Sequence, residues 1–444
     1  MRVGVVGGGV LGLATAHYLK KLGADPVVVE AGGVGGGCSR GNNGWVCPSV
    51  STPLPAPGLT AKSLLWMLRR ASHFHIPAAA LPRLAPWLLR FRAHCTESAR
   101  AHGIRALASL NSVTGERYDE LAADGVEFER GRSGILFAYR DPALRDEKVK
   151  DIETVAAKSG ASWRELDGNE VYGMEPLLRP GFSSGIHVET DRHVRPESLT
   201  EGMAAALRAG GAEIFEGTMV LGFEWDGVGT RRIGRTSKWA SAGTTRVRTS
   251  RWAPGAVREG SRVRAIVTSR GDLEVDAVVL AAGAQTGTLV RMAGWRIPLT
   301  AGKGYSVTIA RPARQLRQPL YLGDARVGLT PFEGALRFGG TMELSGVNRR
   351  MDTARVRALR RAVSREVDIP EAREGGRAWV GMRPMVPDTL PVIGKVPSRE
   401  NVYVNTGHQM LGVTLAPVSG WALAGLVVEG RSGVGLGAFG AERF

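Results

Sequence analysis

The chain has 444 residues, of which 43% are hydrophobic and 23% are charged. These values are ordinary for a soluble globular protein, so they exclude wholesale disorder, and the length predicts two or three domains. The formal net charge is +16, but half of the excess lies within residues 225–264. The charge is therefore a local feature, and nucleic acid is not an expected partner.

The chain begins with a predicted strand at residues 2–6, followed by a helix that ends at Gly23 and a second strand at 27–29. This is a complete βαβ unit within 30 residues. No apolar run is long enough to be a signal peptide or a membrane span. Three cysteines form neither a disulfide framework nor a metal-ligand spacing, so we expect no metal and a reducing, cytoplasmic compartment.

The remaining pattern alternates helices and strands around one insert. Residues 31–58 are predicted to be a loop, and residues 227–260, rich in Gly, Ser, Thr and Arg without a consistent period, an inserted basic surface loop. Apolar periodicity predicts helices at 61–95, 104–123, 143–159, 197–210, 353–366 and 412–429. Alternation predicts strands at 134–139, 185–190, 212–216, 219–224, 262–268, 273–281, 303–310, 327–330, 335–341, 378–382 and 402–405.

A dinucleotide fingerprint stands at the first turn. Gly7, Gly9 and Gly12 form G-x-G-x-x-G between a strand and a helix, and Glu30 follows at the end of the second strand. The glycines allow a tight turn, close approach of a pyrophosphate and close packing of helix on strand, while the carboxylate accepts ribose hydroxyls. The motif predicts a bound dinucleotide and leaves NAD and FAD as alternatives.

Later motifs make the chain resemble the FAD-dependent D-amino acid oxidase and dehydrogenase family, most closely the bacterial D-amino acid dehydrogenases, with glycine oxidase next. The resemblance runs in family order over residues 1 to about 430. Its main motifs are Cys38-Ser39-Arg40-Gly41-Asn42-Asn43-Gly44, Gly217-Thr218-Met219-Val220, Val278-Val279-Leu280-Ala281-Ala282-Gly283-Ala284, Gly302-Lys303-Gly304-Tyr305-Ser306, Gly339-Gly340-Thr341-Met342-Glu343, Gly381-Met382-Arg383-Pro384 and Asn405-Thr406-Gly407-His408.

The resemblance implies an α/β fold with a discontinuous Rossmann-type, glutathione-reductase-like FAD-binding domain. This domain would use residues 1–58, 180–296 and 377–444, with 227–260 as its basic insert. A substrate domain of mixed antiparallel sheet and helices would use 59–179 and 297–376.

The resemblance also implies a non-covalent FAD, in agreement with the absence of any cysteine close in sequence to Arg383 or Tyr305. The residues expected to bind FAD are Gly7, Gly9, Val10, Leu11, Gly12, Glu30, Ala31, Ser39, Asn42, Asn43, Gly44, Val220, Ala282, Gly283, Gly381, Gly407, Leu411, Gly412, Val413 and Thr414.

The implied reaction transfers hydride from the Cα of an amino acid to flavin N5, and the imine then hydrolyses to a 2-oxo acid. Arg383 is expected to hold the substrate carboxylate through its bidentate guanidinium, assisted by the Tyr305 hydroxyl. His408 is expected beside the flavin. Tyr321 and Arg326 are further candidates for lining the substrate pocket. Each of these side chains could instead have only a structural role.

Several alternatives stay open. Glycine oxidase would require Arg where Met410 stands, which favours a dehydrogenase acting on a D-amino acid, with glycine or D-proline as close variants. A secondary-amine oxidase of the sarcosine type is a second possibility. A third is a flavin-containing adaptor that binds a polyanion through 227–260. Oxygen, quinone or a redox protein could reoxidise the flavin, and the 61–95 helices could contact the inner face of a membrane or pack on the substrate domain.

Overall fold

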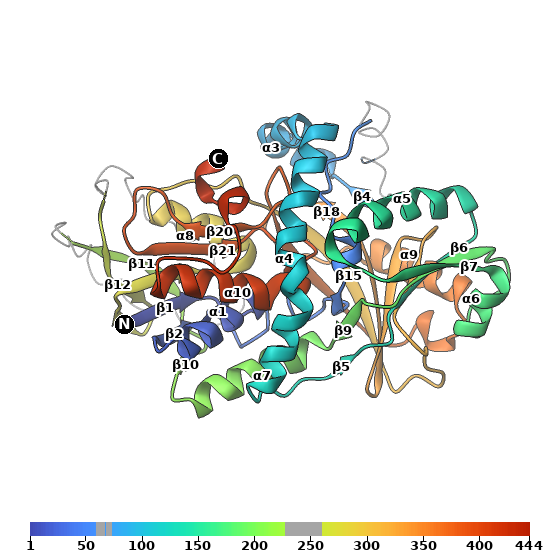
Figure 1. The fold of residues 1–444 in the computed structure, drawn as a ribbon, viewed down its shortest axis with the longest axis horizontal. Coiled ribbons are helices and arrows are strands. Elements are labelled where there is room, and N and C mark those ends of the chain that lie inside the picture. Colours follow the sequence, from blue (N-terminus) through green and yellow to red (C-terminus); the bar gives the residue numbers. More distant parts are fainter. Residues whose placement is uncertain (59–66, 68–72, 227–259) are drawn as a thin grey trace.

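A computed structural model describes residues 1–58, 67, 73–226 and 260–444, so part of the 61–95 segment and nearly all of the 227–260 insert lie outside the described residues. Two large sheets dominate the fold (Figure 1). The first is six-stranded, in the order β10 (Glu213–Phe215), β2 (Asp25–Val29), β1 (Arg2–Val6), β14 (Ala277–Leu280), β21 (Val402–Thr406) and β20 (Val392–Lys395). Its strands are parallel except for β20, which pairs antiparallel with β21.

Helices and a small sheet pack around this parallel sheet. One core cluster joins it to α1 (Val10–Lys21), α7 (Pro196–Ala209) and α10 (Gly412–Val428). Helices α1 and α10 lie side by side in Figure 1, and a Cβ at Gly420 would lie 2.6 Å from the backbone of Ala14. A separate core cluster joins the sheet to α8 (Thr286–Met292) and to a three-stranded antiparallel sheet of β11 (Val220–Trp225), β12 (Val263–Thr268) and β13 (Gly271–Glu274).

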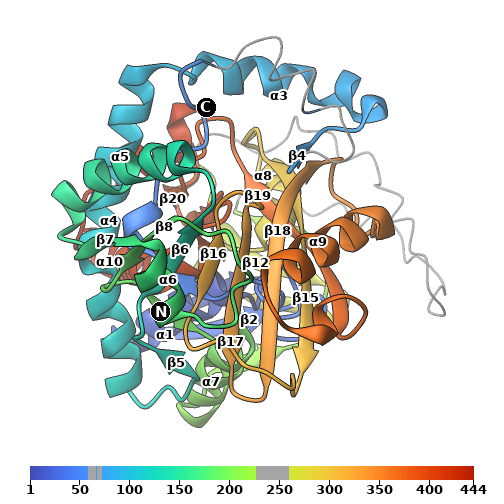
Figure 2. The same ribbon diagram turned by 90° about the vertical axis from the view of Figure 1, so that its right-hand side faces the viewer.

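The second large sheet has nine strands and is mostly antiparallel. Its order is β19 (Arg377–Met385), β15 (Thr300–Ala310), β18 (Ala335–Leu344), β17 (Val327–Phe332), β16 (Leu320–Leu322), β6 (Ile135–Tyr139), β8 (Ser184–Val188) and β7 (Trp163–Asp167), with β4 (Phe74–His75) paired to β18. Helix α9 (Thr353–Glu366) lies beside β15 and β18, as Figure 2 shows. Helix α5 (Pro142–Ser159) packs on β6 and β8 at the other end.

A small sheet pairs β3 (Trp45–Val46) and β5 (Arg130–Gly131) with β9 (Arg192–Val194). Of these strands, β3 and β9 lie in chain segments that run from one large sheet to the other. The long helix α4 (Glu97–Ala123) packs against α10 and α5 (Figure 1). None of the helices in the part of the chain that the structure describes combines the length and the apolar character that a bilayer crossing requires.

Most predicted helices are confirmed, and α9 has the predicted bounds. Helix α4 begins at Glu97 rather than at residue 104, because the Thr96 side chain caps it by accepting a hydrogen bond from the Ala99 N–H at 3.2 Å. Short elements were not predicted: β3, β4, β5, β7, β9, β16, β20, α6 (Gly168–Met174) and α8.

One prediction of secondary structure is wrong, and one is confirmed in part. Residues 273–281 are two strands rather than one, because the chain passes from the three-stranded sheet to the six-stranded sheet at Val275 and Asp276. The described part of 61–95 includes β4 and a single α-helix of several turns, α3 (Leu81–Ala93). The apolar side of α3 packs into the protein through Leu84, Trp87 and Phe91, as expected for a helix packed on the substrate domain.

The sheet topology also changes two predicted domain boundaries. Strands β8 and β19 fall within segments assigned to the FAD-binding domain, yet both pair within the nine-stranded sheet. Their antiparallel partners are β6, β7 and β15. We therefore keep the two-domain division as a proposal in which β8 and β19 belong to the substrate domain.

A buried carboxyl group anchors the connection between β8 and β9. Asp191 is 0% exposed and accepts hydrogen bonds from the Ser49 hydroxyl at 2.5 Å and from the Ser49 N–H at 3.4 Å. Burial raises its pKa to about 7, although the hydrogen bonds from Ser49 act in the opposite direction. Near neutral pH this group therefore holds a proton in the folded protein that it would lose on unfolding.

This proton predicts a pH-dependent stability. Because the folded pKa of Asp191 is raised, its contribution is complete at low pH and is lost as the pH rises from about 4 through about 7. Asp191→Asn removes this titration. Between pH 4 and pH 8 the free energy of unfolding should therefore fall by roughly 2–4 kcal/mol less in the variant than in wild type. Urea unfolding of the holoprotein at both pH values measures this, with Asp272→Asn, at an exposed position, as the control. The same change in unfolding free energy between the two pH values in all three proteins would contradict the raised pKa of Asp191.

Candidate functional site

A large cavity of 1660 Å³ runs from the carboxyl ends of the parallel strands to the edge strand β19. The ends of β1, β2 and β14 meet there, together with residues 36–42 and the first turn of α10. Of the residues predicted to bind FAD, those that line it are Gly7, Gly9, Val10, Leu11, Glu30, Ala31, Ser39, Asn42, Val220, Ala282, Gly283, Gly381, Gly412 and Val413. Segments from across the whole chain thus contribute to one elongated site.

The turn between β1 and α1 cannot accept side chains at its outer glycines. Gly7 has φ +118°, and a Cβ there would lie 2.5 Å from the Ala281 carbonyl oxygen. A Cβ at Gly12 would lie 1.9 Å from the Gly7 carbonyl oxygen. Helix α1 therefore packs directly on the turn, and its N-terminus lies at the cavity, where the helix dipole favours an anion.

A carboxylate and a hydroxyl frame this anion site. Glu30 accepts hydrogen bonds from the N–H groups of Gly8 and Gly32, both at 2.8 Å. Ser39 accepts one from the Val10 N–H at 3.2 Å. Two backbone amides thus hold Glu30 at the cavity, where it fits the ribose hydroxyls of a dinucleotide.

Arg337, which the sequence did not indicate, binds the loop that follows Ser39. Its guanidinium donates to the carbonyl oxygens of Arg40 at 3.0 Å and Asn42 at 2.8 Å, and pairs with Glu197 at 2.5 Å. The side chain is 3% exposed. Arg337 comes from β18 and Glu197 from α7, so no local motif could have revealed this pair.

Six residues of the predicted FAD set lie behind the cavity wall: Gly12, Asn43, Gly44, Gly407, Leu411 and Thr414. They support the wall instead. Asn43 donates to the Gly328 carbonyl at 3.1 Å, and Thr414 donates to the Trp45 carbonyl at 3.0 Å. A Cβ at Gly44 would lie 1.9 Å from the Val194 carbonyl oxygen, so glycine is needed there for close packing.

Arg383 lies on β19 with its guanidinium packed over Gly304 of β15. A Cβ at Gly304 would lie 2.3 Å from the Arg383 Nη1, which donates to the Thr341 carbonyl at 3.0 Å. Arg383 has no carboxylate partner among the described residues. Burial lowers its pKa while the neighbouring Cys38, which lines the cavity, acts to raise it. A guanidinium still remains charged at neutral pH.

Tyr305 does not share this face, contrary to the prediction. Gly304 and Tyr305 are consecutive on β15, so their side-chain positions face opposite sides of the sheet. Tyr305 is 1% exposed, packs with the core beneath α9 and donates its hydroxyl to Glu343 at 2.7 Å. Its hydroxyl is therefore occupied on the side away from Arg383.

His408 lines the cavity, as the resemblance implied. Its Nε2 lies 2.9 Å from the Ser419 hydroxyl. Burial lowers its pKa to about 3, so the imidazole is neutral at physiological pH. It can shape and hydrogen-bond a bound group, but it cannot supply a positive charge.

Tyr321 and Arg326 are not part of the cavity wall. Tyr321 belongs to an aromatic cluster, with ring centroids 6.1 Å from Trp45 and 5.5 Å from Phe137. Arg326 is exposed and has φ +52°. Tyr321 lies within β16 and Arg326 in the turn that follows it, so their role in binding substrate is not supported by this cavity.

Cys38 corrects one further expectation. No cysteine is close to Arg383 in sequence, yet Cys38 lines the cavity and interacts electrostatically with Arg383. Burial raises the pKa of its thiol to about 11, so it carries little thiolate at neutral pH. A non-covalent FAD therefore stays a proposal, supported by this weak nucleophile.

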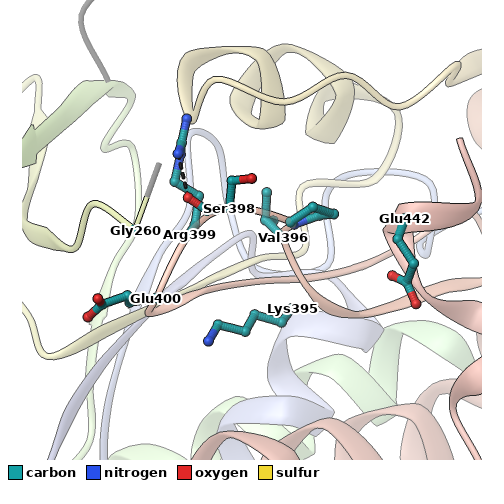
Figure 3. Close-up of a pocket in the computed structure, with 8 residues that line it drawn as sticks. Gly260, Lys395, Val396, Ser398, Arg399, Glu400 and Glu442 are labelled. Atoms are coloured by element: carbon teal, nitrogen blue, oxygen red, sulfur yellow. Dashed lines mark hydrogen bonds between the residues drawn. The ribbon is translucent and has the colours of Figure 1, made fainter. Parts of the chain in front are cut away.

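A second hollow of 440 Å³ lies apart from this cavity, beside Gly260 where the described chain resumes. Figure 3 shows its wall, formed mainly by the turn after β20 with Lys395, Ser398, Arg399 and Glu400, and by Glu442. Arg399 is buried and donates to the Ala293 carbonyl at 2.6 Å. Its side chain therefore holds the turn against the segment after α8.

The glycine packing yields a test of the cofactor site. Gly12→Ala should push α1 away from the Gly7 carbonyl and lower FAD retention by about ten-fold. Gly37→Ala is the matched control, because Gly37 lines the same cavity but its Cβ would meet nothing within 4 Å. Bound FAD per protein after gel filtration measures the effect. Equal FAD content in both variants would contradict the role of this turn.

Comparison with known proteins shows which family has this sequence and fold. The family model DAO, described as FAD dependent oxidoreductase, matches residues 2–426. The D-amino acid dehydrogenase of Methylobacterium nodulans is 30% identical over 443 residues, covering 96% of this chain and 95% of that protein. The D-amino acid dehydrogenase of Rhizorhabdus wittichii is 29% identical over 453 residues, covering 100% of both.

Solved structures agree in fold. Glycine oxidase from Geobacillus kaustophilus superimposes with a TM-score of 0.70 at 22% identity, covering 100% of this chain and 99% of that one. L-proline dehydrogenase from P. horikoshii gives a TM-score of 0.71 at 18% identity, covering 100% and 97%. With the extent of the family match and the glycine-lined cavity, these findings establish that the chain belongs to the DAO family of FAD-dependent oxidoreductases.

Proposed function

We propose that this flavoenzyme oxidatively deaminates a D-amino acid, or a close variant such as glycine or D-proline, to the corresponding 2-oxo acid. The Cα–H would leave as hydride to the flavin and the nitrogen would lose a proton, and water would hydrolyse the imine to the 2-oxo acid and ammonia. With D-proline the imine is cyclic, and hydrolysis would open the ring with the nitrogen retained. The observation that carries the proposal is Arg383, a guanidinium without a carboxylate partner among the described residues and close to the cavity-lining Cys38. The relatives named D-amino acid dehydrogenase support the same substrate class.

The charge of Arg383 favours a carboxylate ligand. A buried cation is costly unless an anion pairs with it, and a guanidinium presents two parallel N–H groups that match a carboxylate. One Nη is already committed to Thr341, which fixes the plane of the group before substrate arrives. The carboxylate would thereby set the position of the substrate's Cα.

The side chains that line the cavity bind and orient rather than react. When bound, FAD supplies the two-electron acceptor for the substrate's Cα–H bond. Because His408 is neutral, it adds no positive charge of its own to the cavity wall. Its bond to Ser419 holds the imidazole in one orientation. The chain thus contributes an anion-binding turn, a carboxylate clamp and a neutral imidazole at the cavity wall.

The electron acceptor is a separate part of the proposal. Oxygen, a quinone or a redox protein would accept the electrons, with peripheral membrane contact as one route to a quinone. Admitting air to the reduced enzyme distinguishes an oxidase, whose flavin absorbance returns rapidly, from a dehydrogenase, whose flavin stays reduced until another acceptor is added.

The reaction class is tested by anaerobic mixing of the holoenzyme with D- and L-amino acids, glycine and sarcosine. Loss of the oxidised-flavin absorbance with D-amino acids is the expected result. Reduction by sarcosine alone would identify a secondary-amine oxidase. A flavin that no amine reduces would overturn the proposed substrate class, although the family assignment would stand.

Arg383→Ala should raise KM for the amino acid by about 30-fold or more, the cost of losing one buried charge partner. The FAD content should stay near wild type, since Arg383 itself is not part of the cavity wall. Arg326→Ala, which removes an exposed arginine, is the control and should leave KM unchanged. Steady-state kinetics with a dye acceptor measure both, and an unchanged KM in Arg383→Ala would contradict the carboxylate assignment.

A further inference from the structure

The position of the Arg383 guanidinium depends on an irregularity between two neighbouring strands. The pairing of β15 with β18 shifts register between Lys303 and Tyr305, so Gly304 alone faces both Thr341 and Met342. This is a β-bulge. The Arg383 Nη1 contacts both bulged residues, donating to the Thr341 carbonyl at 3.0 Å and lying 3.7 Å from the Met342 sulfur.

Thr341 adopts an unfavourable backbone conformation at this bulge. Its φ is +65°, a left-handed value that a β-branched residue rarely takes. Such a conformation costs of order 1–3 kcal/mol and persists only where the surroundings enforce it. The carbonyl that receives Arg383 is therefore held in place by contacts from elsewhere.

Those contacts lie on the opposite face of the sheet. Glu343, two residues after Thr341, pairs with Lys303 at 2.8 Å and accepts the Tyr305 hydroxyl at 2.7 Å. Arg355 of α9 lies 3.8 Å from the same carboxylate. These four side chains are 1–5% exposed. Because Lys303 and Tyr305 flank Gly304 in β15 and Glu343 follows Thr341 in β18, the cluster links the two strands at the bulge.

The charge state of Glu343 agrees with this arrangement. Burial acts to raise its pKa, but the hydrogen bonds from Lys303 and Tyr305 and the charge of Lys303 help to outweigh burial, and the pKa is lowered. Lys303 also donates to the Asn348 side chain at 3.1 Å and to the Arg350 carbonyl at 2.9 Å. The cluster is thus an ionised, hydrogen-bonded network rather than a pair of isolated charges.

We propose that Tyr305 and Glu343 are positioning residues for Arg383, holding the Thr341 bulge so that the guanidinium is presented to a carboxylate. The inference rests on the proposed function, because it takes Arg383 as the carboxylate-binding group. A positioning role differs from a merely structural role of the cluster in one measurable respect. Loss of the network should weaken binding of carboxylates and leave uncharged ligands of the same shape unaffected.

The test uses the holoenzyme with benzoate and benzamide, whose binding is followed by the change in the visible spectrum of bound FAD. Tyr305→Phe removes one hydrogen bond and keeps the ring in its core. It should weaken benzoate binding by about five-fold, the usual effect of one such bond, and leave benzamide binding unchanged. Glu343→Gln should give a larger loss with the same selectivity. Tyr139→Phe, in β6 of the same sheet, is the control and should bind both ligands like wild type.

Equal weakening of benzoate and benzamide in Tyr305→Phe, or no change in either, would overturn the positioning role. If Glu343→Gln does not fold, Tyr305→Phe still decides. A wild type that does not prefer benzoate to benzamide would overturn both the Arg383 assignment and this inference. A wild type that prefers benzoate but whose flavin no amino acid reduces would contradict the proposed function alone.

Discussion

The buried guanidinium of Arg337 connects the two large sheets at the cavity. It extends from β18 of the nine-stranded sheet to Glu197 of α7, a helix in the core of the six-stranded sheet, and donates to carbonyls of the loop that lines the cavity. Breaking such a buried pair from one side would leave a charge unpaired in the interior, which typically costs 3–5 kcal/mol. The placement of the cavity-lining loop against β18 and α7 therefore depends on this buried contact.

The two faces of the nine-stranded sheet carry two kinds of charge, one buried and one partly buried. On one face, Glu343 is compensated by Lys303 and Arg355, so that the cluster is electrically satisfied within the protein. On the other, Arg383 has only a carbonyl and a thioether within hydrogen-bonding reach among the described residues. Folding thus partly desolvates a cation that a substrate carboxylate can pair with. The paired charges on the opposite face of the sheet help to keep that cation in place.

Prediction from the sequence was most successful where local chemistry is decisive. The glycine spacing and Glu30 predicted the first βαβ unit, since backbone conformation and close approach at a turn depend on neighbouring residues alone. Tyr305 shows the opposite case. It stands one residue from Gly304, and only strand pairing and the bulge decide which face each residue occupies, because a shift of one residue moves a side chain across the sheet. The proximity of Cys38 to Arg383 and the contacts of Arg337 were missed for the same reason, because the partners are distant in the chain.

By itself, the sequence determined the α/β class, the dinucleotide-binding turn, most of the longer helices and the family resemblance, because these depend on periodicity and on residues close together in the chain. The tertiary structure decided that β8 and β19 join the nine-stranded sheet, that Arg383 lies over Gly304, and that Tyr305 faces Glu343. These outcomes depend on register and on contacts between strands far apart in sequence, where the energy of packing and charge pairing exceeds any local preference.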